Sequence, residues 1–185
     1  MLKMIRTYVT VLFALIFIAA CSQKEQESTQ TLVTAEVALA SIERIEGRFM
    51  DLINNNPGSP ELNPVMLKLT EEYRIFGDQH PQHELAPEML FRSANLRADG
   101  LGQYQSAINM FNRIIRAYPE TPQAERSLFL IAYTYAEFLS DYEQARTHYE
   151  RFLEQHPDSE LAPSVAVMLE FLGMDINDLI LNFEE

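Results

Sequence analysis

The sequence predicts an all-α fold built from a repeated pair of helices, a short helical solenoid. Between residues 86 and 162 the same pattern occurs twice at a spacing of 38 residues. Small, apolar, aromatic and proline positions recur together at that spacing: Ala86 as Ala124, Leu90 as Leu128, Phe91 as Phe129, Ala94 as Ala132, Tyr104 as Tyr142, Ala107 as Ala145, Phe111 as Tyr149 and Pro119 as Pro157. The apolar residues within each copy follow the three-and-four spacing of one helix face. Self-similarity at such a period is the signature of a helical repeat array.

Each copy is predicted to contain two helices joined by a short turn. The first helix ends at a break around residues 100–102 in one copy and 140–141 in the other. The second helix ends at Pro119 or Pro157, because proline lacks a backbone donor and moves the preceding residue away from helical angles. The two copies therefore supply four helices.

A degenerate copy precedes these two. Residues 60–79 form its second helix, since Met66, Leu69, Tyr73 and Phe76 lie 38 positions before Tyr104, Ala107, Phe111 and Ile114. Residues 35–53 form its first helix, in which Gly47 costs about 1 kcal/mol relative to alanine. The three residues that precede the closing prolines are expected to make the same packing and turn contacts; they are His80, Tyr118 and His156.

The chain is predicted to end in an incomplete repeat. A further first helix begins at Ala162 and stops at Gly173, so that residues 35–173 hold about two and a half to three repeats, near the minimum for a stable stack. Residues 174–185 are expected to form a short helix that covers the exposed end of the solenoid, as terminal repeats must. The alternative for this segment is a docking helix for a partner.

Residues 61–172 resemble the tetratricopeptide repeat family. The resemblance rests on the small residues Ala94 and Ala132, on an aromatic-x-x-alanine motif at Tyr104 and Tyr142, and on the closing prolines. The repeats are longer than the usual 34 residues of the family. Lengthened repeats of this kind are similar to those of BamD-like lipoproteins of outer-membrane protein assembly and of the periplasmic coordinator of the Tol-Pal system.

The N-terminal residues have the layout of a lipoprotein signal peptide. Residues 1–20 carry Lys3 and Arg6, then an apolar run, then small residues before the sole cysteine. The apolar run is about half the roughly 20 residues needed to span a bilayer, which favours cleavage over a transmembrane helix. The expected lipidation site is Cys21, and residues 21–34 are expected to form a flexible tether. Ser22 at the next position favours an outer-membrane lipoprotein that faces the periplasm.

The resemblance implies that the first helix of each repeat lines a concave groove that binds a segment of another protein. Candidates for this groove are the polar first-helix residues that lie off the core stripe: Glu88, Arg92, Asn95, Asp99, Arg126, Tyr133 and Glu137. Three of them align at the repeat spacing with three others, so they are expected to form neighbouring rows. An ordinary solvated helix face is the simpler explanation of the same pattern.

Signals for chemistry are sparse in this sequence. The chain has no nucleophile elbow, phosphate-binding glycine loop or metalloprotease motif, so we expect a protein without catalytic activity, cofactor or metal. His80 and His83 lie close together but lack further ligands, His148 is expected to be solvated, and Tyr142 and Tyr149 are assigned to the core. The net charge of −13 disfavours nucleic acid as a partner.

These observations together predict an envelope lipoprotein that acts as a non-catalytic scaffold for other proteins. One hypothesis places it in outer-membrane protein assembly, and a second makes it a periplasmic adaptor of the Tol-Pal and cell-division machinery. An envelope hydrolase or a metal-binding protein is the alternative from another class. The partner would be an envelope protein, with the membrane held through the lipid on Cys21.

Overall fold

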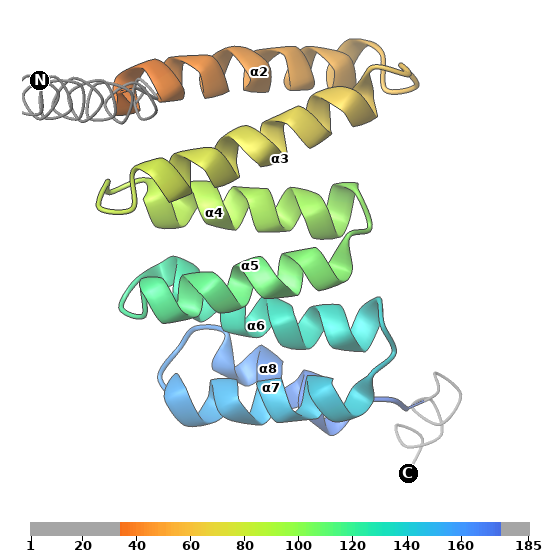
Figure 1. Ribbon diagram of the computed structural model, residues 1–185. Helices are drawn as coiled ribbons and strands as arrows, with labels where there is room; N and C mark the ends of the chain where they lie inside the picture. The colour runs from red at the N-terminus through yellow and green to blue at the C-terminus, as the bar shows by residue number, and fades with distance from the viewer. Residues whose placement is uncertain (1–33, 175–185) are drawn as a thin grey trace, which may run out of the picture. The chain divides into compact units, whose positions relative to one another are not determined.

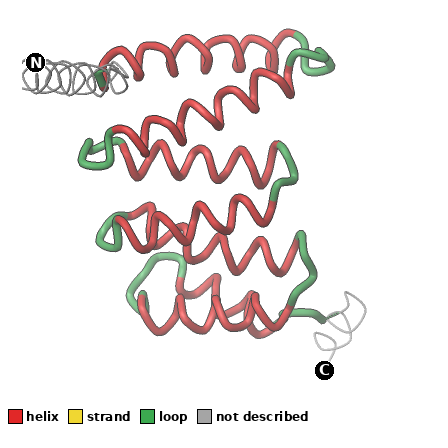
Figure 2. Tube along the Cα trace, viewed as in Figure 1, coloured by secondary structure: helices red, strands yellow, loops and turns green. Residues whose placement is uncertain are grey.

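The computed structural model describes residues 34–174, and every regular element in that range is helical (Figures 1 and 2). The α-helices are α2 (Ala35–Asn55), α3 (Leu62–Gln79), α4 (Ala86–Asn95), α5 (Tyr104–Ala117), α6 (Pro122–Glu137), α7 (Tyr142–Gln155) and α8 (Ala162–Glu170). A π-helical segment, η1 (Leu96–Gly100), continues α4. The signal peptide, Cys21, most of the tether and nearly all of the C-terminal helix that the sequence predicts lie outside the described residues.

The helices form a stack of antiparallel pairs in which each helix packs on the next (Figure 1). In addition, α4 packs directly against α6, whereas no comparable contact joins α5 to α7. The first helices of the two copies therefore lie closer together than the second helices do. This arrangement is the helical solenoid that the sequence predicts.

The turns that close the second helices share one geometry, as predicted. His80, Tyr118 and His156 have φ of −125°, −137° and −130° and ψ of 53°, 52° and 54°. The backbone N–H of each donates to the carbonyl four residues earlier, and its own carbonyl accepts from the residue three positions later at 3.0–3.1 Å. The residue before each proline thus ends the helix in the same way whether it is histidine or tyrosine.

Capping side chains fix where two of the helices begin. The Thr121 hydroxyl accepts from the Ala124 N–H at 3.3 Å, and a carboxylate oxygen of Asp141 accepts from the Gln144 N–H at 3.1 Å. Each satisfies a donor that has no partner within its helix. Prolines occupy the first turns of α4, α6 and α8, where the missing N–H costs nothing.

Small residues allow the helices to approach closely. Ala94 and Ala132 are fully buried, as the alignment of the two copies predicts. Gly77 in α3 is packed against the fully buried Leu90 in α4, so that an added Cβ would lie 2.5 Å from Cγ of that leucine. The α3–α4 packing therefore depends on a glycine inside a helix.

Two side chains differ from the sequence-based expectation. Tyr142 occupies a repeat position expected in the core, yet 46% of it is exposed, because it lies at the start of α7 beside the open end of the array. His148 is not simply solvated: its ring stacks on Tyr135 with centroids 5.7 Å apart, and its Nδ1 is buried. Tyr149, in contrast, is buried as predicted.

Helix boundaries differ from the expected ones by a few residues, with one change of type. The predicted helices 35–53 and 60–79 run over Ala35–Asn55 and Leu62–Gln79. The first helix that begins at Ala86 does not stay α-helical to its break; it widens into η1, where the Leu101 N–H donates to the Leu96 carbonyl. Gly102, at φ 62°, then reverses the chain in the left-handed region.

Candidate interaction face

The polar residues predicted for the groove lie along the first helices of the two copies, on α4, η1 and α6. Arg92, Asp99, Arg126 and Glu137 are exposed, and Glu88, Asn95 and Tyr133 are partly buried. Arg126 and Glu137 are eleven residues apart, about three helical turns, so they share one face of α6. We call the surface made by these seven side chains the first-helix face.

A hydrogen-bonded network joins the N-terminal half of this face. Nε of Arg92 donates to Glu88 at 2.7 Å, and the Gln123 side chain of α6 donates to the other oxygen of Glu88 at 3.0 Å. Burial opposes ionisation of Glu88, but the hydrogen bonds from Arg92 and Gln123 outweigh it, so the pKa of Glu88 lies below its ordinary value. The carboxylate of Glu88 therefore links α4 to α6.

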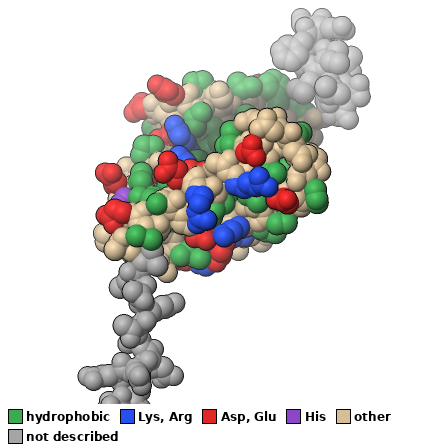
Figure 3. Space-filling view, turned by 90° about the horizontal axis from the view of Figure 1, so that it is seen from above, with side chains coloured by type: hydrophobic (Ala, Val, Ile, Leu, Met, Phe, Trp, Pro, Cys, Tyr) green, Lys and Arg blue, Asp and Glu red, His purple; other side chains and the backbone are tan. Residues whose placement is uncertain are grey.

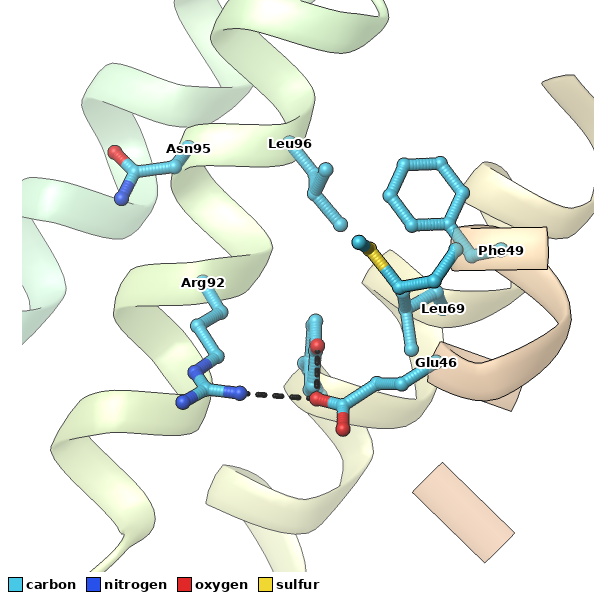
Figure 4. A pocket seen from close by; sticks show the side chains of 8 residues that line it. Glu46, Phe49, Leu69, Arg92, Asn95 and Leu96 are labelled. Atoms are coloured by element: carbon cyan, nitrogen blue, oxygen red, sulfur yellow. Dashed lines mark hydrogen bonds and ion pairs between the residues drawn. The ribbon is translucent and has the colours of Figure 1, made fainter. Parts of the chain in front are cut away.

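Arg92 also reaches across to α2. Its Nη1 donates to Oε1 of Glu46 at 2.9 Å, and the same oxygen accepts from the Tyr73 hydroxyl at 2.5 Å (Figure 4). The hydrogen bond that Arg92 donates to Glu88 raises the pKa of Arg92 further above neutrality, and burial raises the pKa of Tyr73. At neutral pH the cluster therefore holds a charged arginine and a neutral tyrosine.

A recess of about 400 Å³ opens beside this cluster, between α2, α3 and α4. Its lining is largely apolar and consists of Glu46, Phe49, Met50, Leu69, Tyr73, Arg92, Asn95 and Leu96. Figure 4 shows Phe49 and Leu96 on opposite sides, with the Glu46–Arg92 pair at one end. We call it the α2–α4 recess.

A second recess of about 380 Å³ lies at the other end of the array, between α6, α7 and α8. Glu137 and Tyr142 border it, together with Met168 and Met174. Between the two recesses, Tyr133 packs on Phe129 and against Phe138, with ring centroids 6.0 Å apart in both pairs. We call this second hollow the α6–α8 recess.

The structure therefore distributes the predicted groove residues over more than one hollow. Arg92 and Asn95 border the α2–α4 recess, Glu137 borders the α6–α8 recess, and Arg126 lines a shallow hollow with the loop around Ser159. Sequence reasoning missed the residues that α2 and α3 add to the first recess. The sequence held one sign of this recess: Tyr73 carries a polar hydroxyl at the repeat position where the next copy has Phe111.

The histidines near the first turn act in packing. The rings of His80 and His83 lie 5.1 Å and 5.2 Å from the ring of Phe76, and Nδ1 of His83 accepts from the Leu85 N–H at 3.1 Å. Within residues 34–174, no group of three or more histidine, cysteine or carboxylate side chains is arranged to hold a metal ion. Both histidines pack against Phe76 beside the turn between α3 and α4.

Charges of both signs are mixed on the surface of the array. Figure 3 shows the end of the stack that is uppermost in Figure 1, where basic side chains have acidic and apolar neighbours. Elsewhere in the described range, too, basic and acidic side chains form ion pairs, such as Arg48 with Glu61 at 2.7 Å and Arg113 with Asp78 at 2.5 Å. Exposed pairs of this kind contribute little to the free energy of unfolding, so the fold does not depend on them.

The repeated pairs of helices match a known family of repeats. Residues 88–121 and 126–159 match the tetratricopeptide repeat family model. These two segments are tetratricopeptide repeats. The first covers most of α4 with η1 and α5, and the second covers most of α6 and α7. Because such repeats are protein-interaction modules, they indicate a scaffold for other proteins.

A search of curated proteins found no match to the chain. Helices α2, α3 and α8 lie outside the two matched repeats, although α2 and α3 extend the same stack. Each helix of the described range, residues 34–174, is too short or too polar to cross a membrane.

Proposed function

We propose that this protein is a lipid-anchored scaffold of the bacterial envelope that binds a segment of another protein on its first-helix face. The observation that carries the proposal is the pair of tetratricopeptide repeats whose first helices, α4 and α6, pack together and carry the polar side chains of the first-helix face. Stacked repeats build extended surfaces of this kind for binding partners.

The envelope part of the proposal is supported by the N-terminal sequence. A charged start, a short apolar run and small residues before Cys21 are the features of a lipoprotein signal peptide. Ser22 favours the outer membrane, with the repeats in the periplasm. We further propose that the pathway is outer-membrane protein assembly, because the lengthened repeats are similar to those of BamD-like lipoproteins.

The test is affinity purification after crosslinking in living cells, with a charge-swapped variant of the first-helix face. Arg126→Glu combined with Glu137→Lys reverses two exposed charges that form no ion pair with another described residue, and it leaves the net charge unchanged. Arg146→Glu with Glu150→Lys is the matched control, since both residues are exposed on the second helix α7.

The proposal predicts that mass spectrometry recovers β-barrel assembly components with the wild type and the α7 control, and loses them with the first-helix variant. Equal thermal stability of the three proteins shows that the loss is not unfolding. Recovery of Tol-Pal or cell-division proteins instead would assign the protein to that pathway and contradict a role in outer-membrane protein assembly. A partner set that no variant changes would contradict binding on this face.

The anchor and the non-catalytic role have separate tests. Cys21→Ala is expected to release the protein from the membrane fraction, and retention there would contradict lipidation. Metal analysis of the purified protein is expected to find no stoichiometric ion, with or without His80→Ala and His83→Ala. A bound ion that disappears in that double variant would support the metal-binding alternative.

A further inference from the structure

The contact between α6 and α7 contains a histidine ring. The ring of His148 on α7 stacks on the ring of Tyr135 on α6, with centroids 5.7 Å apart and an angle of 11° between the planes. Nδ1 of His148 is buried and has no hydrogen-bond partner among the described residues. We propose that this contact is an acid-sensitive joint. When His148 takes up a proton, its ring leaves Tyr135, and α7 loosens from α6 together with α8.

Helix α7 is held by fewer buried side chains than its counterpart α5. Ala107, Ile108, Met110, Phe111 and Ile114 are buried on α5, and Ala145, Tyr149 and Phe152 are buried on α7. The repeat spacing places Arg146 and His148 where α5 has Ile108 and Met110. Because α7 lacks these two buried apolar side chains, the stacked ring of His148 is a larger share of what holds it to α6.

Helix α8 depends on α7 in turn. It packs on α7 at the end of the stack and buries Ala162 and Val165 (Figure 1). Together α6, α7 and α8 form the wall of the α6–α8 recess. Loosening of α7 would therefore carry α8 with it and open that recess.

The stacked position has no place for a second proton on the ring. A neutral imidazole carries one N–H, and the protonated form carries two. Because Nδ1 of His148 is buried without an acceptor, the neutral ring holds its proton on Nε2. A proton added to Nδ1 would create a charged donor that is buried and unpaired, which is strongly unfavourable. The protonated ring therefore has to turn out into water.

The groups around the ring also oppose a positive charge. Burial lowers the pKa of His148, and the positive charge of Arg151, three residues later on α7, lowers it further. Of the two helices packed against α7, α6 presents the neutral ring of Tyr135, and α8 contributes no charged group to the electrostatics of His148. No carboxylate of the described range therefore stabilises the protonated form in place.

The direction and size of the effect follow from proton linkage. A histidine exposed to water has a pKa of about 6.5, so the loosened state takes up the proton first as the pH falls. With a stacked ring that stays neutral, the ratio of loosened to stacked protein rises by up to about thirtyfold from about pH 8 to about pH 5. The joint is thus fully stable above about pH 7 and weakens below about pH 6.5.

The equivalent joint of the first repeat does not titrate in this range. The repeat spacing puts Arg97 and Met110 in the places of Tyr135 and His148. Arginine keeps its charge at every pH of interest, and methionine has none to change. The first repeat is therefore an internal reference for the second.

The test is hydrogen–deuterium exchange of the full-length protein, measured by mass spectrometry at about pH 8 and about pH 5. Each exchange rate is divided by the intrinsic rate at the same pH, which gives the protection of each helix. We expect the protection of α7 and α8 to fall by about five- to thirtyfold at the lower pH, and that of α5 to change much less. Unchanged protection of α7, or an equal loss in α5, would overturn the proposal.

Two variants assign the effect to one histidine. His148→Met gives α7 the residue type that α5 has at this position, and the ratio of its α7 protection at the two pH values should be close to one. His156→Gln, at the end of the same helix, is the matched control and should keep the loss seen in the wild type. A wild-type ratio in His148→Met, or a ratio of one in His156→Gln alone, would overturn the role of His148.

Discussion

Gly77 offers a sharp test of the helix packing, because an alanine there has no room. A Cβ at this position would lie 2.5 Å from Cγ and 2.6 Å from Cδ2 of Leu90, a side chain with no exposed surface. Overpacking of a core costs about 1–3 kcal/mol, and the gain in helix propensity from glycine to alanine is about 1 kcal/mol. Because Leu90 is fully enclosed, we expect Gly77→Ala to lower the free energy of unfolding by about 1–2 kcal/mol.

The same substitution at Gly47 is the control. Gly47 lies inside α2, and an added Cβ meets no atom within 4 Å. Only the helix propensity remains, so Gly47→Ala should raise the free energy of unfolding by about 0.5–1 kcal/mol. One chemical change is thus expected to have opposite signs at two helical positions.

Urea denaturation followed by circular dichroism measures both effects, and thermal melts should move in the same directions by about 2–4 °C per kcal/mol. A Gly77→Ala protein as stable as the wild type, beside a stabilised Gly47→Ala protein, would refute the close packing of α3 on α4. Destabilisation of both would instead show that helix propensity was misjudged.

Three further substitutions probe single interactions. Tyr73→Phe removes the hydroxyl that donates to Glu46 and should cost about 1.5–3 kcal/mol in urea melts, the usual range for a hydrogen bond to a charged group; no change would show that this bond contributes nothing. Burial, aided by the charge of Arg151, lowers the pKa of His148 below 6.5, so the unfolded chain takes up the proton first as the pH falls. The free energy of unfolding should therefore be constant above about pH 7 and decline below about pH 6.5. In His148→Gln, the melting temperature measured from about pH 8 to about pH 5 should fall less than in the wild type. An equal fall in the variant would contradict this role of His148. Asp141→Ala removes the cap of α7 and should cost about 0.5–2 kcal/mol by urea denaturation, whereas Asp141→Asn should recover most of that loss.

The helix pairs and their turns could be predicted from the sequence because they depend on local rules. Apolar periodicity located the helices, and proline located their ends, as the shared backbone angles at His80, Tyr118 and His156 show. The repeat spacing also identified the close crossings at Ala94 and Ala132. These features require only neighbours along the chain or one period away.

The features that the sequence did not reveal are those in which equivalent repeat positions have different neighbours in the structure. Tyr142 has the same repeat position as Tyr104, but Tyr104 stacks on Phe138, the residue that caps the C-terminus of α6, while Tyr142 borders the α6–α8 recess. Alignment at the repeat spacing assumes equal surroundings and therefore assigned Tyr142 to the core. The recess beside Tyr73 was also missed, because it depends on a hydrogen bond between Arg92 and Glu46, which are 46 residues apart and not at the repeat spacing.

The central claim is that another protein binds on the first-helix face, and site-specific photocrosslinking in living cells tests it most directly. Benzoylphenylalanine in place of Tyr133, a partly buried aromatic residue on α6, is compared with the same residue in place of the exposed Glu150 on α7. We predict one dominant adduct of defined mass from position 133 and none of that mass from position 150. Equal adducts from both positions, or adducts from position 150 alone, would contradict the claim.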